Sequence, residues 1–115
     1  MSRNTRSRAE TQRRAHAPVF AALGDETRLA LVARLSDGDR HSITRLTEGS
    51  DLTRQAVTKH LRVLQKAKIV RCIRSGRESL FALDPEPLME IREYLDRVSG
   101  QWDQALLRLK AFVEE

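Results

Sequence analysis

Five polar side chains recur at helical spacing on one face of a predicted helix, and they are Arg54, Gln55, Thr58, Lys59 and Arg62. Their guanidinium, amide, hydroxyl and ammonium groups can contact base edges and phosphates in the DNA major groove. Val57, Leu61 and Leu64 occupy another face of the same helix. We therefore predict a recognition helix, with one face packed on the protein and the other presented to DNA.

The basic residues are concentrated around this helix. The chain has 115 residues and a formal net charge of +5, yet residues 52–77 contain eight basic residues and no acidic one. Residues 78–115 contain nine acidic and four basic residues. A segment that neutralises phosphates binds DNA with an affinity that falls as salt rises. For Lys66 and Lys68 the alternative is that they only solvate a helix end.

Length and composition limit the class of protein. The 115 residues suffice for one domain, and no apolar run reaches the length of about 18 residues that a membrane-spanning helix needs. The single cysteine, Cys72, predicts a reducing cytoplasm, where a DNA-binding protein associates with the nucleoid. We expect Cys72 to be a small core residue rather than a redox switch. Phosphate-loop and nucleophile motifs are absent, so we predict that the protein is not an enzyme and that it binds no cofactor.

Three segments are predicted along the chain. Residues 1–14 are rich in arginine and almost free of apolar residues, and we expect a disordered basic arm. Residues 15–84 form the DNA-binding core, and residues 85–115 form a long dimerisation helix packed on that core. The predicted fold is mainly α with a small β-hairpin wing (α+β), a winged helix-turn-helix.

Helix boundaries follow from local residues. A short helix begins near Ala15, with Pro18 in its first turn and Gly24 as a left-handed C-cap. Asp25 caps a second helix, whose inward residues are predicted to be Leu29, Val32, Ala33 and Leu35. Ser42 then caps a short helix, and after a turn at residues 49–51 a longer helix runs from its cap at Thr53 to about residue 66.

A β-hairpin is predicted directly after the recognition helix. Residues 69–74 and 79–83 have strand composition, and Ser75 and Gly76 supply the turn. Arg74 and Arg77 then lie near the tip, from which arginines reach phosphates or a narrow minor groove. The alternative is that the hairpin only covers the core and that both arginines are solvated.

Apolar residues of the C-terminal helix alternate by three and four over about four heptads. Such a seam exceeds what a small domain covers by itself, so we predict that it packs against a second chain. The alternative places the helix across its own domain, with Trp102 as a core plug. Gly100 either permits close approach of a partner or marks a kink. The predicted dimer-interface residues are Leu88, Ile91, Leu95, Val98, Trp102, Ala105, Leu109 and Phe112.

The motifs around the recognition helix resemble a known family. Residues 52–64, with the sequence LTRQAVTKHLRVL, resemble the recognition helix of ArsR/SmtB-type winged-helix repressors, and residues 23–29 and 76–78 are similar to other parts of that family. The resemblance covers about residues 18–84. It implies a homodimeric repressor that binds operator DNA and leaves it upon a signal, for example an unidentified small-molecule effector. Two-fold symmetry then predicts an inverted-repeat operator.

Residues 99–106 are similar to a subgroup of this family that lacks metal ligands. Ser42 and Thr44 stand where the metal sensors have cysteines, and neutral hydroxyls are poor ligands for soft metals. The C-terminal helix has no histidine, so we predict no metal site. The three histidines are scattered, and they are His16, His41 and His60. His60 is expected either to approach a phosphate or to pack along the edge of its helix.

The alternative function is that of a winged-helix module that binds protein partners instead of DNA. Such a module should carry apolar anchors on the outer face of the recognition helix, whereas this face is polar. We therefore predict a transcriptional regulator whose partners are double-stranded DNA and a second copy of itself. Its predicted DNA-binding residues are Ser42, Thr53, Arg54, Gln55, Thr58, Lys59, Arg62, Arg74 and Arg77.

Overall fold

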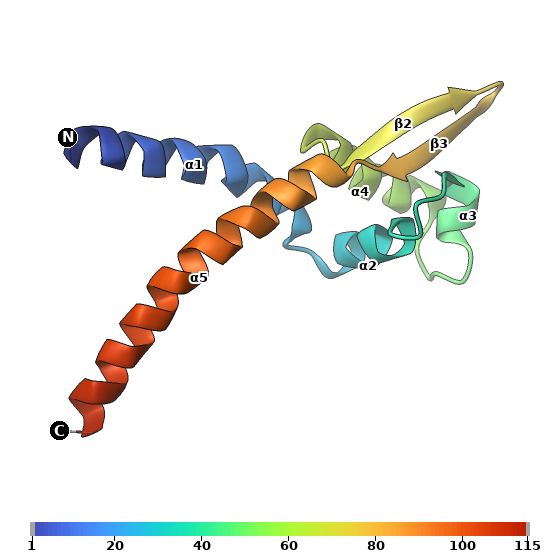
Figure 1. Ribbon diagram of the computed structural model, residues 1–115. Coiled ribbons are helices and arrows are strands. Elements are labelled where there is room, and N and C mark those ends of the chain that lie inside the picture. The colour runs from blue at the N-terminus through green and yellow to red at the C-terminus, as the bar shows by residue number, and fades with distance from the viewer. Residues whose placement is uncertain (1, 115) are drawn as a thin grey trace.

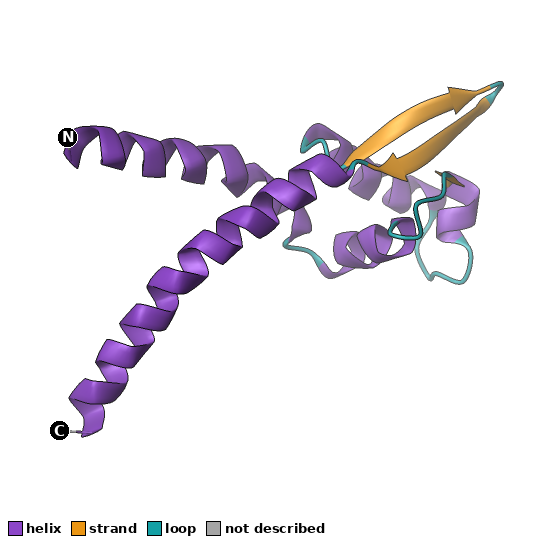
Figure 2. Cartoon of the chain, in the orientation of Figure 1, coloured by secondary structure: helices purple, strands orange, loops and turns teal. Residues whose placement is uncertain are grey.

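The computed structural model describes the backbone of residues 2–114 and the side chains of residues 7–114. Its elements in chain order are α1 (Ser2–Leu23), α2 (Glu26–Leu35), β1 (His41–Ser42), α3 (Ile43–Thr47), α4 (Arg54–Lys66), β2 (Val70–Ser75), β3 (Glu78–Leu83) and α5 (Pro85–Glu114). Helices dominate, and a small antiparallel sheet carries the wing (Figures 1 and 2). The predicted winged helix-turn-helix is thus confirmed.

Three helices begin at the caps that local sequence predicts. The Asp25 carboxylate accepts a hydrogen bond from the backbone N–H of Arg28 at 3.0 Å, at the start of α2. Ser42 and Thr53 cap α3 and α4 in the same way, and their hydroxyl oxygens accept from backbone N–H groups three residues later at 3.1 and 3.0 Å. Each cap satisfies a donor that a helix start otherwise leaves unpaired.

The core lies between α2, α4 and the sheet, and its largest fully buried side chains are Leu35, Leu46, Leu61, Leu64, Ile69, Val57 and Val70. On α2 the predicted inward face was partly wrong. Leu29 is 52% exposed and Ala33 is exposed, whereas Leu31 and Leu35 are buried. Residues four apart share a helix face while residues two apart do not, so burial of Leu31 and Leu35 turns Leu29 outward.

The sheet has the strand order β1-β3-β2. The β2–β3 hairpin turns at Gly76, whose φ of +62° glycine adopts without steric cost. The two-residue strand β1, which the sequence analysis did not predict, pairs with β3 through His41 and Phe81. Cys72 lies on the edge strand β2 and is exposed, so the prediction of a core cysteine was wrong. The reason is that β2 leaves the core after the buried Val70.

Helix α1 is longer than predicted. Residues 2–14, expected to be disordered, are helical, and Pro18 lies inside the helix rather than in its first turn. The arginine, alanine, glutamate and glutamine of this segment are good helix formers, a local preference that needs no apolar burial. Gly24 does not adopt the predicted left-handed conformation. Instead, α1 ends in a tight turn in which the N–H of Asp25 donates to the carbonyl of Leu23 at 2.9 Å.

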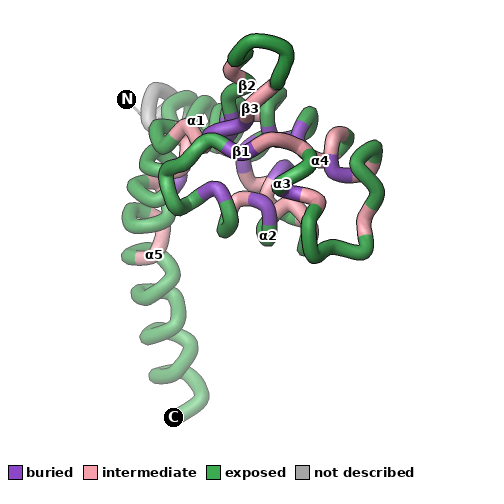
Figure 3. The backbone as a smooth tube through the Cα atoms, turned by 90° about the vertical axis from the view of Figure 1, so that its right-hand side faces the viewer, coloured by how far each residue is buried: buried purple, intermediate pink, exposed green. Residues whose placement is uncertain are grey.

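Helix α5 runs without a break through Gly100, so the helix does not end or divide there. Its first half packs on the chain, and the Tyr94 ring lies 4.9 Å from His16 and 6.1 Å from Phe20 of α1, centroid to centroid. From residue 100 to residue 114 every residue is exposed (Figure 3). In the part of the chain that the structure describes, no helix is long and apolar enough to cross a membrane.

Candidate nucleic-acid interface

Helix α4 separates an apolar face from a polar one. Val57, Leu61 and Leu64 are each at most 1% exposed and belong to the core. The four longest polar side chains of the predicted recognition set are all exposed, and they are Arg54, Gln55, Lys59 and Arg62. Because burial of one face fixes the rotation of the helix, the polar face is presented to solvent, where a duplex can approach.

Thr58 differs from its neighbours on this helix. It is half-buried, and its hydroxyl donates a hydrogen bond to the carbonyl of Arg54 at 2.7 Å. The hydroxyl hydrogen is therefore occupied within the helix. Thr58 can still contact a base edge through its methyl group and through the two lone pairs of its oxygen.

The two capping residues lie at helix starts. Ser42 is half-buried and Thr53 is exposed, and each uses its side-chain oxygen as an acceptor for its own helix. Each hydroxyl still carries one donor. Donors at a helix start suit a phosphate oxygen. Of these two helices, α4 has 13 residues whereas α3 has only five.

The wing projects its arginines away from the core. Arg74 pairs with Ser79 across the hairpin, and Arg77 follows the turn at Gly76. Both arginines are exposed. Figure 1 shows the hairpin tip extending beyond α3 and α4. The geometry therefore leaves both guanidinium groups free to reach a surface next to the one that α4 contacts.

His60 is anchored to the start of α2. Its Nδ1 lies 3.2 Å from Nη1 of Arg28 and 3.8 Å from the carboxylate of Asp25. The Nε–H of Arg28 also donates to the carbonyl of Ala22 at the end of α1. His60 thus packs against the start of α2, a contact that neither of the two predicted roles included. Arg28 was not predicted as a partner of His60, because the two lie 32 positions apart and no local pattern connects them.

Asp25 is the acidic member of this cluster. The backbone N–H of Arg28 donates to its carboxylate, and this hydrogen bond, with the nearby Arg28 guanidinium and His60, holds the pKa of Asp25 below its ordinary value of 3.8. The same carboxylate that caps α2 therefore stands beside the recognition helix as an anion. It ties the orientation of α4 to the junction between α1 and α2.

The predicted dimer-interface residues divide into two groups. Ile91 is 6% exposed and Leu88 packs against the same core, so these two belong to the chain's own interior. Val98 is half-buried, whereas the remaining five residues are exposed, and they are Leu95, Trp102, Ala105, Leu109 and Phe112. Trp102 is 56% exposed, so it is not a core plug within this chain.

The seam prediction omitted two large apolar residues. Leu106 is 62% exposed and Val113 is 80% exposed. At 3.6 residues per turn both lie close to the line through Trp102 and Leu109. A helical wheel with that pitch, rather than a strict seven-residue repeat, would have included them. The exposed apolar face of α5 consists of Trp102, Leu106, Leu109, Phe112 and Val113.

Potential metal ligands are dispersed. Among the residues that the structure describes, no three His, Cys, Asp or Glu side chains gather into a group that could hold a metal ion. His41 is buried and its Nε2 lies 2.9 Å from the Asp37 carboxylate. The hydrogen bond from the backbone N–H of Asp39, with the contact to His41, lowers the pKa of Asp37 below its ordinary value. This pair closes the loop between α2 and β1, away from α4.

Comparisons with known proteins agree with this geometry. A family model described as a helix-turn-helix domain matches residues 23–73. The HTH-type transcriptional regulator Rv2034 of Mycobacterium tuberculosis is 38% identical over 88 residues, which cover 76% of this chain and 78% of that protein. The regulator YuzN of Bacillus subtilis is 34% identical over 79 residues, which cover 64% of this chain and 86% of that protein.

A solved structure shows the same relationship. An ArsR-like transcriptional regulator from Rhodococcus sp. RHA1 matches with a TM-score of 0.70 and 33% identity, covering 85% of this chain and 92% of that chain. The chain therefore belongs to the ArsR-type winged helix-turn-helix family of DNA-binding transcriptional regulators, a family of regulators and not of enzymes.

Proposed function

We propose that this regulator is a homodimeric repressor that recognises an inverted-repeat operator. The observation that carries the proposal is the combination of an exposed polar face on a rigidly packed α4 with an uncovered apolar face on α5. The first supplies sequence-specific contacts, and the second supplies the surface that pairs two recognition helices. Repression, rather than activation, rests on the family to which the chain belongs.

The contacts of α4 are assigned by chemistry. Arg54 and Gln55 lie in the first turn of α4, where a guanidinium pairs with the acceptors of guanine and an amide pairs with adenine. Thr58 adds a methyl contact to a base. Lys59 and Arg62 bind phosphates and set the register of the helix, without reading sequence. Ser42 and Thr53 donate to phosphates from the starts of α3 and α4.

The wing extends the contact. Arg74 and Arg77 reach the phosphates or the narrow minor groove beside the half-site that α4 occupies. Two-fold symmetry then places the two half-sites about one helical turn apart, roughly 34–36 Å from centre to centre. Because these contacts bind chromosomal DNA, we propose that the protein associates with the nucleoid.

The exposed apolar face of α5 holds the dimer. Its five large side chains are between 56% and 80% exposed in the single chain. A contiguous apolar surface of this kind marks an interaction site, and pairing with a second copy removes it from water. Leu95 and Val98 extend the same side of the helix toward the core, and Ala105 lies within the exposed part of α5, between Trp102 and Leu109. A small-molecule signal that weakens operator binding would then release both half-sites together.

Selection of bound duplexes from a random DNA pool tests this proposal. Wild-type protein should enrich an inverted repeat with half-sites about one helical turn apart. Arg54→Ala should lose the preference at one base position per half-site, at a cost of about 1–3 kcal/mol. Arg97→Ala removes an exposed cation on α5 and serves as the matched control, which should enrich the wild-type motif.

Two outcomes would contradict the proposal in different places. Retention that depends on salt but enriches no motif would reduce the basic face to a nonspecific phosphate-binding surface. Enrichment of a single, unpaired half-site would agree with the proposed roles of the α4 residues but contradict binding as a dimer.

A further inference from the structure

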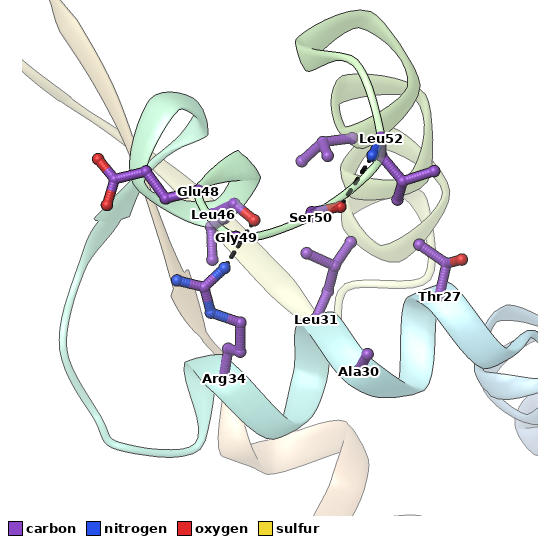
Figure 4. A pocket seen from close by; sticks show the side chains of 10 residues that line it. Thr27, Ala30, Leu31, Arg34, Leu46, Glu48, Gly49, Ser50 and Leu52 are labelled. Atoms are coloured by element: carbon purple, nitrogen blue, oxygen red, sulfur yellow. Dashed lines mark hydrogen bonds between the residues drawn. The ribbon is translucent and has the colours of Figure 1, made fainter.

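A cavity of about 290 Å³ lies behind the recognition helix, between α2 and the turn that joins α3 to α4 (Figure 4). Its floor is apolar and consists of Leu31, Leu46, Leu52 and Val57. Three of these are core residues, at 4%, 1% and 1% exposure for Leu31, Leu46 and Val57, and Leu52 is half-buried. The cavity therefore opens directly onto the side chains that hold α4 in place.

The two walls of the cavity are held differently. On the α2 side, Arg34 donates to the carbonyls of Leu46 and Arg45 at 2.7 and 2.9 Å, which ties α2 to the end of α3. The opposite wall is the turn, where Gly49 has a φ of +73° and the N–H of Leu52 donates to the hydroxyl oxygen of Ser50 at 3.0 Å. A molecule in the cavity touches a fixed wall and a turn that leads into α4.

We propose that this cavity binds a small neutral aromatic molecule, and that the bound molecule weakens DNA binding by displacing the turn before α4. This site would regulate the proposed function, and only its effect on DNA binding rests on that function. Ligand binding itself requires only the cavity.

Size and charge define the ligand class. A dry cavity of about 150 Å³ holds one benzene ring, so a cavity of about 290 Å³ admits a fused two-ring molecule. The Glu48 carboxylate points away from the cavity in Figure 4, and the Arg34 guanidinium already donates to two backbone carbonyls. The apolar floor therefore favours a ligand without net charge. The Ser50 hydroxyl still has a hydrogen to donate and Thr27 adds a second hydroxyl, so one polar group on the ligand can be satisfied.

The site is separate from both proposed interfaces. Val57 is the floor residue that α4 supplies, and it lies on the buried face of that helix, whereas none of the residues assigned to DNA lines the cavity. In Figure 1 the turn between α3 and α4 lies at the opposite end of the molecule from the projecting part of α5. The cavity therefore shares no lining residue with the two proposed interfaces, as a separate regulatory site requires.

Indole, a neutral two-ring compound, is the probe for the first experiment. Its titration is followed by methyl NMR of full-length protein labelled at leucine and valine. Wild-type protein should show saturable shifts centred on the floor residues Leu31, Leu46, Leu52 and Val57. Ala30→Leu fills the mouth of the cavity from an exposed helix position and should weaken indole binding at least tenfold. Ala33→Leu makes the same change on the same helix outside the cavity and should leave the affinity unchanged.

The second experiment measures the Kd for the selected operator duplex. Saturating indole should raise this Kd about tenfold in wild-type and Ala33→Leu protein, within the usual range of allosteric coupling, and should leave it unchanged in Ala30→Leu. Equal thermal melts of the two variants would show that both fold.

Three results would overturn the proposal. Chemical shift changes that grow linearly with indole concentration would contradict a specific ligand site. Changes that centre on Leu106, Leu109 and Val113 of α5 would contradict its placement in the cavity. Saturable indole binding that leaves the Kd for the operator unchanged would contradict the proposed effect of the ligand on DNA binding. Since the NMR titration uses no DNA, failure of the proposed operator leaves the test of the ligand site intact.

Discussion

Helices α4 and α5 are both amphipathic, but only α4 has its apolar face covered by its own chain. Val57, Leu61 and Leu64 of α4 are at most 1% exposed, whereas the five residues of the exposed apolar face of α5 are between 56% and 80% exposed. Ile91 is buried in the first half of α5, but from residue 100 to residue 114 every residue is exposed. Helical periodicity thus predicts that a face will be covered without saying which chain covers it.

The largest expected effect is the difference in unfolding free energy between a substitution in α4 and one in the exposed part of α5. Leu61→Ala removes a fully buried side chain and should lower the free energy of unfolding by about 2–5 kcal/mol. Leu107→Ala, at a position of α5 that is 60% exposed and lies off the apolar face, should change it by about 0.5 kcal/mol or less. Urea unfolding followed by circular dichroism measures both. Equal losses would show that α4 and α5 are covered to the same degree.

A second substitution tests what covers α5. Trp102→Ala should weaken the dimer by about 2 kcal/mol or more, because buried tryptophans carry much of the energy of an interface. This corresponds to a rise of about 30-fold in the dimer Kd, measured by analytical ultracentrifugation over a dilution series. Gln104→Ala, an exposed polar position on the other side of α5, is the control. A monomeric wild-type protein would contradict the proposed role of this face.

The polar face of α4 is tested by salt dependence. Lys59→Ala should weaken binding to all DNA sequences similarly and reduce the slope of log K against log salt by about 1. Arg97→Ala on α5 removes the same charge far from α4 and should leave the slope close to that of the wild type. If both substitutions lower the slope equally, net charge rather than the α4 face governs binding.

The smallest expected effect is on the pH dependence of stability, and it concerns Asp25, which caps α2 and lies beside His60 of α4. The pKa of Asp25 is lowered in the folded chain, chiefly by the hydrogen bond from the N–H of Arg28, so its ionised form stabilises the fold above the ordinary pKa of 3.8. This contribution is lost as the pH falls through the lowered value. Asp25→Asn keeps a capping side chain without a titrating carboxyl. Its unfolding free energy should therefore change less than that of the wild type between about pH 6 and about pH 3.

The acid range contains a second carboxyl whose pKa is also lowered, Asp37. Both proteins retain it, so its contribution cancels in the comparison of their unfolding midpoints. Identical pH dependence in the two proteins would show that the Asp25 carboxylate stabilises the fold only through its capping geometry and not through its charge.

Local features were predicted well, and features that depend on distant residues were not. The caps at Asp25, Ser42 and Thr53 need only a backbone N–H three residues away, and such short-range hydrogen bonds are visible in sequence. The helical start of α1 was missed because few apolar residues suggested disorder, although the local preference of its residues is helical. The roles of the individual DNA-binding residues remain predictions.

The amino-acid pattern alone specifies a recognition helix with a polar face, a hairpin and a long amphipathic C-terminal helix, because spacing, capping and turn chemistry act over a few residues. Tertiary packing decided that His60 meets Arg28 across 32 residues, that Cys72 lies outside the core, and that a cavity remains beside Leu52. These outcomes depend on how separate elements fill a common volume. No spacing along a single segment encodes that fit.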